Sequence, residues 1–297
     1  MWLRKRTALA IAALALGVAG IALFGNVVAS RAWSNAGMLA LSRVLRSSDP
    51  GMAPLRRFAQ AEALLRKALE LDDHNAPAHR GLGFILWDQG SREQAGEEWR
   101  AGGIPYADFR RVAARANRAG DSENALDWYY RAIVLAPAAS DAYASAATVL
   151  FDMGEEGQAL ALIDQALALD AFDSESAEVT AHFNRAEILR KMERSREAMA
   201  EYEWVVERRP NDYWAHIRLG ALLWEVEQDA VRTEGLFLRA AEINPAAKWA
   251  YSRLGGFYRE VGRSAEALQM YLRVLAIDST DESAQKAVQA LSDGGGQ

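Results

Sequence analysis

Small and apolar residues recur along this chain with the spacing of helix faces, inside a longer period of about 34 residues that extends from Ala76 to Asp281. Each period begins with a predicted helix that carries a small residue near its middle and a ring four residues earlier. The small residues are Gly83, Ala113, Ala147, Ala186, Gly220 and Gly255, and the rings are His79, Phe109, Tyr143, His182, His216 and Tyr251. Residues four apart share one face of a helix. The pattern therefore predicts that a neighbouring helix approaches at the small residue and that a ring fills the gap beside it.

A second predicted helix in each period repeats this arrangement, with alanine followed four residues later by a large residue. The pairs are Ala95 and Trp99, Ala125 and Tyr129, Ala159 and Ile163, Ala198 and Tyr202, and Ala267 and Tyr271. Glycine at Gly90, Gly120, Gly154 and Gly262 marks turns between the two helices, because glycine readily adopts the left-handed conformation that ends a helix. Proline at Pro137, Pro210 and Pro245 ends the second helices. Each unit is therefore predicted to be helix, tight turn, helix and short loop, stacked on its neighbours.

These landmarks resemble the tetratricopeptide repeat (TPR), whose signature is an aromatic residue, Leu-Gly, a small residue, a second aromatic residue, Ala and Pro at set offsets. The units begin at Ala76, Tyr106, Ser140, Val179, Tyr213 and Lys248. Two depart from the pattern: Ala171 replaces the usual proline, and one extra residue precedes Phe237. The resemblance covers about 70% of the chain. It implies an all-α, TPR-like α-solenoid, a right-handed superhelix of helix-turn-helix repeats. The N-terminal segment is predicted to add one transmembrane helix before this solenoid. Such a resemblance is specific for the fold and weak for the function.

The two ends of the repeat array are expected to be capped. A second-helix pattern over Phe58 to Leu71 lacks an intact first helix, because Ser47 to Gly51 interrupts it, so residues 31–75 are predicted to form a degenerate capping repeat. Six repeats occupy residues 76–281, and residues 282–297 form a cap helix and a disordered tail. Ser174 to Glu178 is predicted to be either an extension of the first helix in its unit or a loop.

The N-terminal segment has the composition of a membrane anchor. Residues 7–30 contain no formal charge, and a helix of that length would reach about 36 Å, enough to cross a hydrocarbon core of about 30 Å. Residues 1–6, with Arg4-Lys5-Arg6, form a basic tail that is expected to stay in the cytoplasm. A cleaved signal peptide, with cleavage after Ala29, is the alternative. The prediction is a single-pass protein with its repeats on the periplasmic or extracytoplasmic side, or a secreted protein if the segment is cleaved.

Composition and charge limit the possible functions. Residues 32–297 carry 30 basic and 40 acidic residues, a balance that argues against sequence-independent nucleic-acid binding. The chain has no cysteine, which excludes disulfides, thiolate metal sites and a cysteine nucleophile. His79, His182 and His216 occupy the ring position of their units, and His74 has no metal-ligand spacing. The sequence contains no Gly-rich phosphate cradle and no nucleophile turn. No enzymatic activity, cofactor or metal site is therefore expected.

The resemblance implies a partner-binding groove along the first helices. The family's groove positions fall on Arg80, Phe84, Trp87, Arg110, Arg111, Asn117, Arg118, Phe151, Asn184, Arg190, Trp214, Arg218, Trp224, Trp249 and Arg253. They also fall on Thr148, Phe183, Glu187, Lys191, Ile217 and Ser252. Arginine and aromatic residues are enriched at interface hot spots, and guanidinium groups bind carboxylates with two hydrogen bonds. The family's carboxylate clamp also requires an asparagine, and Ala114 and Phe84 stand at the positions where it would lie.

Three hypotheses follow from this groove. The first is a membrane-anchored scaffold that binds an acidic or C-terminal segment of a protein partner in an envelope assembly, secretion or polysaccharide-export complex. The second is a carbohydrate- or polymer-binding accessory protein that uses the same arginine and aromatic groove. The third, an enzyme, would need a compact polar site that the sequence does not show. Alternatively, the rings only pack between repeats and the arginines pair with acidic neighbours. The sequence does not indicate the oligomeric state.

Overall fold

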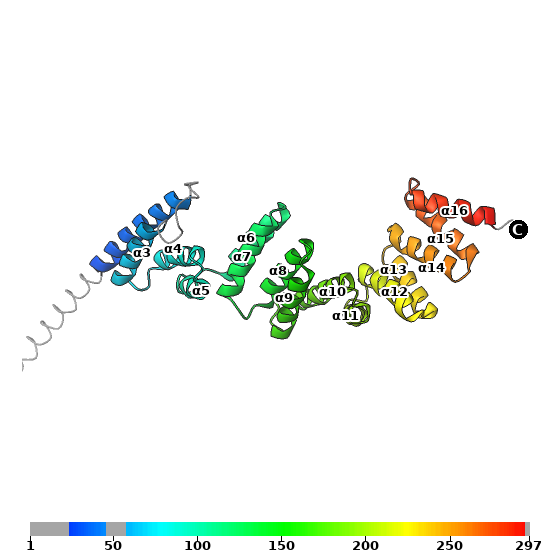
Figure 1. The fold of residues 1–297 in the computed structure, drawn as a ribbon, viewed down its shortest axis with the longest axis horizontal. Helices are drawn as coiled ribbons and strands as arrows, with labels where there is room; N and C mark the ends of the chain where they lie inside the picture. The colour runs from blue at the N-terminus through cyan, green and yellow to red at the C-terminus, as the bar shows by residue number, and fades with distance from the viewer. Residues whose placement is uncertain (1–23, 46–57, 295–297) are drawn as a thin grey trace, which may run out of the picture. The chain divides into compact units, whose positions relative to one another are not determined.

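The computed structural model describes residues 24–45 and 58–294, and every regular element among them is a helix (Figure 1). The chain divides into two compact units, Met1–Ala138 and Ala139–Gln297. The first unit contains the N-terminal helix (residues 24–45), α3 (Ala59–Leu71), α4 (Ala76–Asp88), α5 (Arg92–Ala101), α6 (Tyr106–Arg118) and α7 (Ser122–Leu135). The second contains α8 (Ser140–Asp152), α9 (Glu156–Leu169), α10 (Glu175–Lys191), α11 (Ser195–Arg208), α12 (Tyr213–Glu227), α13 (Ala230–Ile243), α14 (Lys248–Glu260), α15 (Ser264–Ile277) and α16 (Glu282–Gly294).

The helices begin and end where the repeat pattern places them. Five of the six first helices begin at the predicted residue, and α16 matches the predicted cap helix. The remaining first helix, α10, begins earlier, at Glu175, because Ser174 caps it by accepting a hydrogen bond from the Ala177 amide at 3.2 Å. Ser174 to Glu178 is therefore an extension of the helix, one of the two predicted alternatives. The all-α repeat fold is confirmed.

The seam between paired helices explains the small residues. A side chain on Gly220 or Gly255 would collide with Phe237 or Tyr271, the ring that the second helix of the same repeat contributes. Gly83 is in the same relation to Trp99. The alanines at the equivalent second-helix positions are fully buried. The ring that fills each gap thus comes from the second helix, and glycine or alanine is needed where that ring lies against the first helix.

The turns between paired helices use the predicted glycines. Gly90, Gly120, Gly154 and Gly262 all have φ between 78° and 84°, in the left-handed region where glycine meets no steric penalty. The turn between α10 and α11 instead places Glu193 at φ 60°. A residue with a Cβ atom is strained in this conformation, so this turn stores a small free-energy cost.

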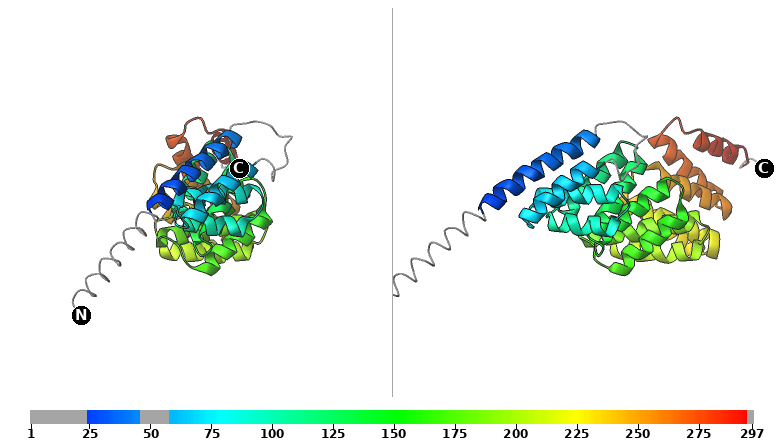
Figure 2. Two further views of the ribbon diagram at one scale, coloured as in Figure 1. Left: turned by 90° about the vertical axis from the view of Figure 1, so that its left-hand side faces the viewer. Right: turned by 60° about the vertical axis from the view of Figure 1, so that its left-hand side comes forward.

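The N-terminal helix differs from the prediction. It continues through residue 30, where the predicted transmembrane segment ends, and it lies beside α3 (Figure 2). Ser30 is fully buried, donates a hydrogen bond to the Ala68 carbonyl at 2.8 Å and accepts one from Asn75 Nδ2 at 2.7 Å. Leu41 joins the apolar cluster around Leu65. The first helix of the opening repeat is therefore formed by residues that include the end of the predicted anchor.

The other predictions for the N-terminal region lie outside the described residues. These are the basic tail, residues 7–23 of the predicted span, and the interruption at Ser47 to Gly51. Within residues 24–45 and 58–294, none of the helices combines the length and the apolar character that crossing a membrane requires.

Candidate functional site

The first helices of the second unit carry a hollow of about 460 Å³ lined by three arginines from three successive repeats. Arg190 comes from α10, Arg218 from α12 and Arg253 from α14. Glu193 and Glu225 also line it. All three arginines are at predicted groove positions, so the fold brings together side chains that lie far apart in the sequence.

Two of these arginines share one carboxylate. Glu187 lies 2.9 Å from Arg190 and 2.8 Å from Arg218, and it also accepts a hydrogen bond from the Tyr202 hydroxyl. Burial alone would favour the protonated form of Glu187, but these donors lower its pKa below the ordinary value. Burial and the neighbouring carboxylate raise the pKa of Tyr202. Glu187 is therefore a charged residue that holds two arginines in place, a role that its groove position alone does not indicate.

The third arginine has no such partner. Arg253 is exposed, and it makes no hydrogen bond or ion pair with any residue that the structure describes. Glu193 and Glu225 are likewise exposed and make no ion pair within the described part of the chain. Among the described residues, the groove of the second unit therefore contains the unpaired basic side chain of Arg253 and the unpaired acidic side chains of Glu193 and Glu225. Its arginines alone would suggest a purely basic groove.

A smaller hollow of about 260 Å³ adjoins the first and shares Arg253 and Glu225 with it. We call it the α12–α14 slot, and Glu260 also lines it. Its apolar lining comes from Ala221, Trp224, Phe237, Trp249 and Phe257. The Trp224 indole N–H donates to Glu260 Oε2 at 2.5 Å, and its ring lies edge-on to Phe257 with 5.1 Å between centroids. Trp249 is 52% exposed and has no ring or cation neighbour among the described residues.

The other predicted groove residues of the second unit are partly occupied by internal contacts. Asn184 donates a hydrogen bond to Thr148 Oγ1 at 3.0 Å. Trp214 is 45% exposed, and the Arg218 guanidinium lies 5.9 Å from the centre of its ring. Ile217 is buried in the core, which corrects its assignment to the groove, because its side chain packs toward α13 and α14. Phe151, Phe183 and Ser252 are partly exposed, and Lys191 is exposed.

In the first unit the predicted groove rings surround a cation of the protein itself. The Arg131 guanidinium lies 5.8 Å from the ring centre of Phe84, 5.4 Å from that of Trp87 and 4.3 Å from that of Trp128. Arg131 also pairs with Asp127 at 2.6 Å. Burial lowers the pKa of Arg131. Phe84 and Trp87 therefore contribute to a packed internal cluster, as the alternative interpretation expects.

The arginines of the first unit are mostly held by neighbours. Arg80 Nε donates to the Gly102 carbonyl at 2.7 Å, Arg110 lies over the Tyr106 ring, and Arg111 pairs with Asp108 at 2.7 Å. Arg118 is exposed and unpaired within the described residues, and Asn117 is half-buried.

The histidines at the ring positions have structural partners. His79 Nδ1 lies 2.6 Å from Glu98 Oε2, and His182 Nδ1 lies 2.6 Å from Glu201 Oε2. His216 Nδ1 lies 2.8 Å from the Asp212 carbonyl. Partial burial opposes protonation of His79, but its hydrogen bonds to Glu98 and to a backbone carbonyl raise its pKa. Each contact ties a histidine to its own repeat.

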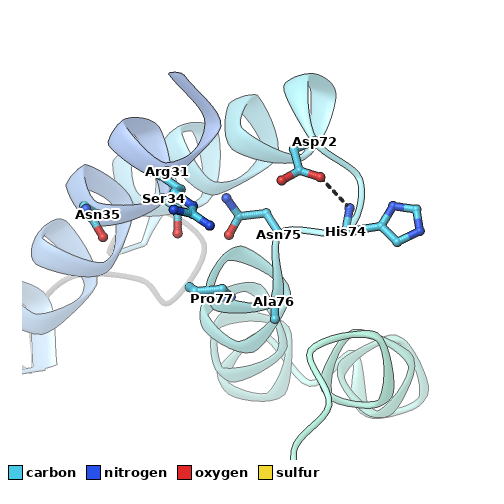
Figure 3. A pocket seen from close by; sticks show the side chains of 8 residues that line it. All are labelled: Arg31, Ser34, Asn35, Asp72, His74, Asn75, Ala76 and Pro77. Atoms are coloured by element: carbon cyan, nitrogen blue, oxygen red, sulfur yellow. Dashed lines mark hydrogen bonds between the residues drawn. The ribbon is translucent and has the colours of Figure 1, made fainter. Parts of the chain in front are cut away.

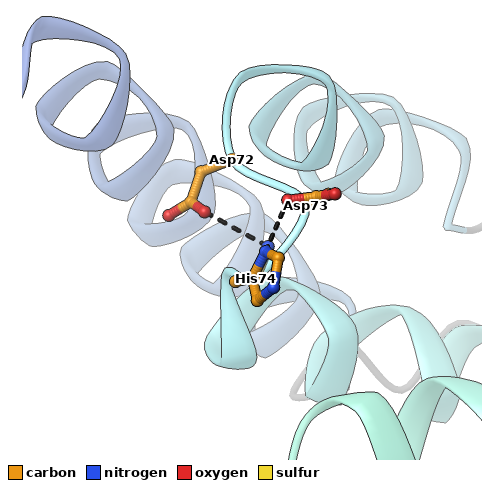
Figure 4. A group of neighbouring side chains, drawn as sticks. All are labelled: Asp72, Asp73 and His74. Carbon is orange, nitrogen blue, oxygen red and sulfur yellow. Dashed lines mark hydrogen bonds and ion pairs between the residues drawn. The ribbon is translucent and has the colours of Figure 1, made fainter. Parts of the chain in front are cut away.

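A further hollow of about 470 Å³ lies between the N-terminal helix and the loop before α4, with Arg31, Ser34 and Asp72 in its lining (Figure 3). In the same loop Asp72, Asp73 and His74 bring possible ligand atoms within 4.8 Å of one another (Figure 4). The sequence did not suggest this group. Its members already contact one another, since the His74 amide donates to Asp72 and His74 Nδ1 lies 2.6 Å from Asp73. Exposed acidic groups are common without an ion, so we assign no metal to it.

Sequence reasoning missed Arg131 and Gly256. Arg131 is on a second helix, outside the groove positions of the repeat, so no periodic signal marks it. Gly256 follows the small residue Gly255 and lines the α12–α14 slot, and a double glycine inside a helix was the available signal.

Comparison with known proteins supports the repeat pattern. Three sequence-family models described as tetratricopeptide repeat match residues 55–114, 179–212 and 250–285. A search of curated proteins found no match.

Solved structures with the same fold share little sequence with this chain. YrrB, described as a TPR protein with an unusual peptide-binding site, is 19% identical; the match covers 76% of this chain and 97% of YrrB, with a TM-score of 0.51. MamA of Desulfovibrio magneticus RS-1 is 18% identical, covering 60% of this chain and 97% of MamA, with a TM-score of 0.53. The C-terminal part of a TPR repeat-containing protein from Cytophaga hutchinsonii is 12% identical, covering 86% and 99%, with a TM-score of 0.52. At these identities the likeness concerns the fold alone. The chain contains tetratricopeptide repeats, and the matched segments lie in both of its compact units.

Proposed function

We propose that this protein is an interaction scaffold that binds an extended segment of a partner protein along the first helices of its second unit. The observation that carries the proposal is the pair of adjoining hollows there, where Arg253 makes no hydrogen bond or ion pair and Trp249 makes no ring contact with the described residues. Their combined size suits several residues of a peptide, and a solvent-exposed tryptophan and an unpaired arginine are typical anchors of an interface.

The charges in this groove favour a segment of mixed sign. Glu187 occupies Arg190 and Arg218, so Arg253 is the arginine best able to bind a partner carboxylate. Glu225 and Glu193 can bind basic groups of the same segment. This refines the acidic partner that the arginines alone suggested.

A photo-crosslinking experiment tests the proposal. A benzoylphenylalanine residue replaces Trp249 in the groove, or Leu272, which is exposed on the second helix α15, as the control. We expect a partner adduct from position 249 and none from position 272. In the chain that carries benzoylphenylalanine at position 249, a second substitution, Arg253→Glu, should reduce the amount of adduct at least tenfold. Arg273→Glu on α15 should leave that amount unchanged. The proposed binding site along the first helices would be wrong if Arg253→Glu left the amount of adduct unchanged, or if the adduct formed equally at positions 249 and 272.

Carbohydrate binding is the second candidate, because the exposed faces of Trp214 and Trp249 would also stack on sugar rings. A glycan array probed with the full-length chain distinguishes the two. Glycan binding that is lost in Trp249→Ala, without any protein adduct, would favour a polysaccharide ligand.

We further propose that residues 7–30 attach the protein to a membrane, with the repeats on the extracytoplasmic side, where the scaffold would serve an envelope assembly, secretion or polysaccharide-export complex. The support is the charge-free stretch behind a basic tail. Because Ser30 is buried against Ala68 and Asn75, the proposed membrane segment would have to end before this residue. Mass spectrometry of the purified N-terminus tests attachment, since a chain beginning at Ser30 would show cleavage, and protease accessibility in intact cells tests the orientation.

A further inference from the structure

We propose that the α12–α14 slot is a specificity pocket that accepts one aromatic side chain of the partner, while Arg253 binds the carboxylate next to that side chain. This inference rests on the proposed scaffold function and names the chemistry that the groove recognises. The carboxylate can belong to a neighbouring Asp or Glu or to a chain terminus.

The size and the walls of the slot suit a single ring. Its volume of about 260 Å³ is below the range of about 300–1,000 Å³ that is typical of pockets for whole small molecules. The wall is already ordered, because Trp224 is fixed by its hydrogen bond to Glu260 and by Phe257, and Phe257 in turn lies edge-on to Phe237 with centroids 6.4 Å apart. An entering ring would find aromatic side chains in the wall, against which rings prefer to pack edge-on or offset.

Gly256 keeps the slot open. A Cβ atom on this residue would meet only the Tyr271 hydroxyl, at 3.9 Å, so packing within α14 and α15 does not require glycine there. Gly255, one residue earlier, is required by packing, since a Cβ atom would lie 2.9 Å from the Tyr271 ring. Glycine in the interior of a helix costs roughly 1 kcal/mol relative to alanine. A space for a ligand side chain explains why this cost is tolerated at Gly256.

Arg253 decides the charge of the neighbouring group. It lines both hollows and therefore lies at the boundary of the slot, with no internal partner in the described residues. Of the two carboxylates in the lining, Glu260 already accepts the Trp224 N–H, whereas Glu225 makes no ion pair within residues 24–45 and 58–294 and can bind a basic group of the partner beside the ring. An aromatic ring beside a carboxylate satisfies the rings and Arg253 together, with the two-pronged hydrogen bonding that guanidinium favours.

The test uses small probes and the full-length chain, labelled with ¹⁵N at its nine tryptophan indoles. The probes are N-acetyltryptophan, which has a ring and a terminal carboxylate, and N-acetyl-Trp-Asp-amide, which has a ring and a side-chain carboxylate. N-acetyltryptophanamide lacks the carboxylate and N-acetylalanine lacks the ring. Trp224→Phe and Trp249→Phe assign the two indole signals of the slot.

We expect N-acetyltryptophan and N-acetyl-Trp-Asp-amide to shift the Trp224 and Trp249 signals. The probe that binds more tightly shows whether the slot prefers a terminal or a side-chain carboxylate. N-acetyltryptophanamide should bind at least fivefold more weakly than N-acetyltryptophan, and N-acetylalanine at least tenfold more weakly. Gly256→Leu should fill the slot and weaken N-acetyltryptophan at least tenfold, and Gly256→Ala only about twofold. Arg253→Gln should bring the acid and the amide within twofold of each other.

Three results would overturn the specificity pocket: no shift at either indole, equal binding of the acid and the amide by the wild-type chain, or unchanged binding by a folded Gly256→Leu. These outcomes are separable from failure of the scaffold. If a partner adduct forms at position 249 but no probe binds, the scaffold function stands and the specificity pocket is wrong. If the probes bind but no adduct forms, the specificity pocket stands and the scaffold function is wrong.

Discussion

Two adjacent glycines in α14 should respond in opposite ways to the same substitution. Gly255→Ala and Gly256→Ala both remove the conformational cost of glycine in a helix, which is worth about 1 kcal/mol of unfolding free energy. The new methyl group at position 255 would lie 2.9 Å from Tyr271 Cζ and 3.0 Å from both ring ε carbons. At position 256 it would meet a single atom at 3.9 Å, an ordinary van der Waals distance.

The magnitude follows from how far Tyr271 can move. Its side chain is buried against the core cluster of α12 to α16, so it cannot move away without disturbing that packing. Overfilling a packed core costs about 1–3 kcal/mol. Because the gain in helix propensity is common to both variants, it cancels in their comparison. Gly256→Ala should therefore be more stable than Gly255→Ala by about 1–3 kcal/mol, and more stable than the wild type by up to about 1 kcal/mol.

Hydrogen exchange of the α14 and α15 amides is the suitable assay. Repeat proteins unfold locally, so a global melting curve would dilute an effect confined to one repeat. Since the two residues share a helix and a repeat, each variant serves as the control of the other. Equal protection in the two variants would refute the idea that the ring of the second helix dictates the small residue of the first.

Three further substitutions test other parts of the structure. Ser30→Ala should weaken the docking of the N-terminal helix by about 1–3 kcal/mol, because it leaves the buried Asn75 side-chain amide without its acceptor, whereas the Ala68 carbonyl keeps the Asp72 amide as a donor. Hydrogen exchange of α3 would detect the loss, and unchanged exchange would contradict this role of Ser30. Since the pKa of His79 is raised in the folded state, its contribution to stability is complete below about pH 6.5 and is lost as the pH rises through the folded pKa. His79→Phe should therefore remove part of the decrease in melting temperature between pH 6 and pH 8, and an identical pH profile would contradict this. Glu187→Gln should lower the unfolding free energy by about 1–3 kcal/mol in urea titrations. It should also flatten the pH dependence of stability at acid pH, because the wild type loses stability there as the pH falls through the lowered pKa of Glu187. A variant as stable as the wild type would contradict a stabilising role of the contacts between Glu187, the two arginines and Tyr202.

The repeat fold could be predicted because its periodic residues have one physical task. Ala198 and Tyr202 meet the adjacent helix in the same way as Ala267 and Tyr271, and each alanine is fully buried. Such seams recur at fixed spacing and are visible without any knowledge of long-range packing. The same holds for Gly90 and the other turn glycines, whose left-handed φ follows from local geometry.

The role of the N-terminal helix could not be predicted in this way. Small and apolar side chains can face either lipid or another helix, so the composition of residues 24–30 fits both environments. What distinguishes them is the pairing of Ser30 with Ala68 and Asn75, residues about 40 positions away. A serine at the end of an apolar stretch resembles a membrane boundary until its distant partners are known.

The candidate site differs between the two units for a similar reason. A ligand that used Phe84 and Trp87 would have to displace Arg131, which is held by Asp127 and by the face of Trp128. A cation–π contact contributes about 0.5–2 kcal/mol, so this displacement would oppose binding.

In the second unit a ligand at Trp249 and Arg253 would break no hydrogen bond, ion pair or ring contact, because neither side chain makes one with the described residues. Arg190 and Arg218 are held in the way that Arg131 is held in the first unit. Both would have to break their ion pairs with Glu187 before they could bind a ligand. The interpretation in which groove arginines only pair with acidic neighbours therefore holds for these two and fails for Arg253. For this reason a substitution at Arg253 should affect a partner more than it affects the fold, whereas a substitution at Arg218 should do the reverse.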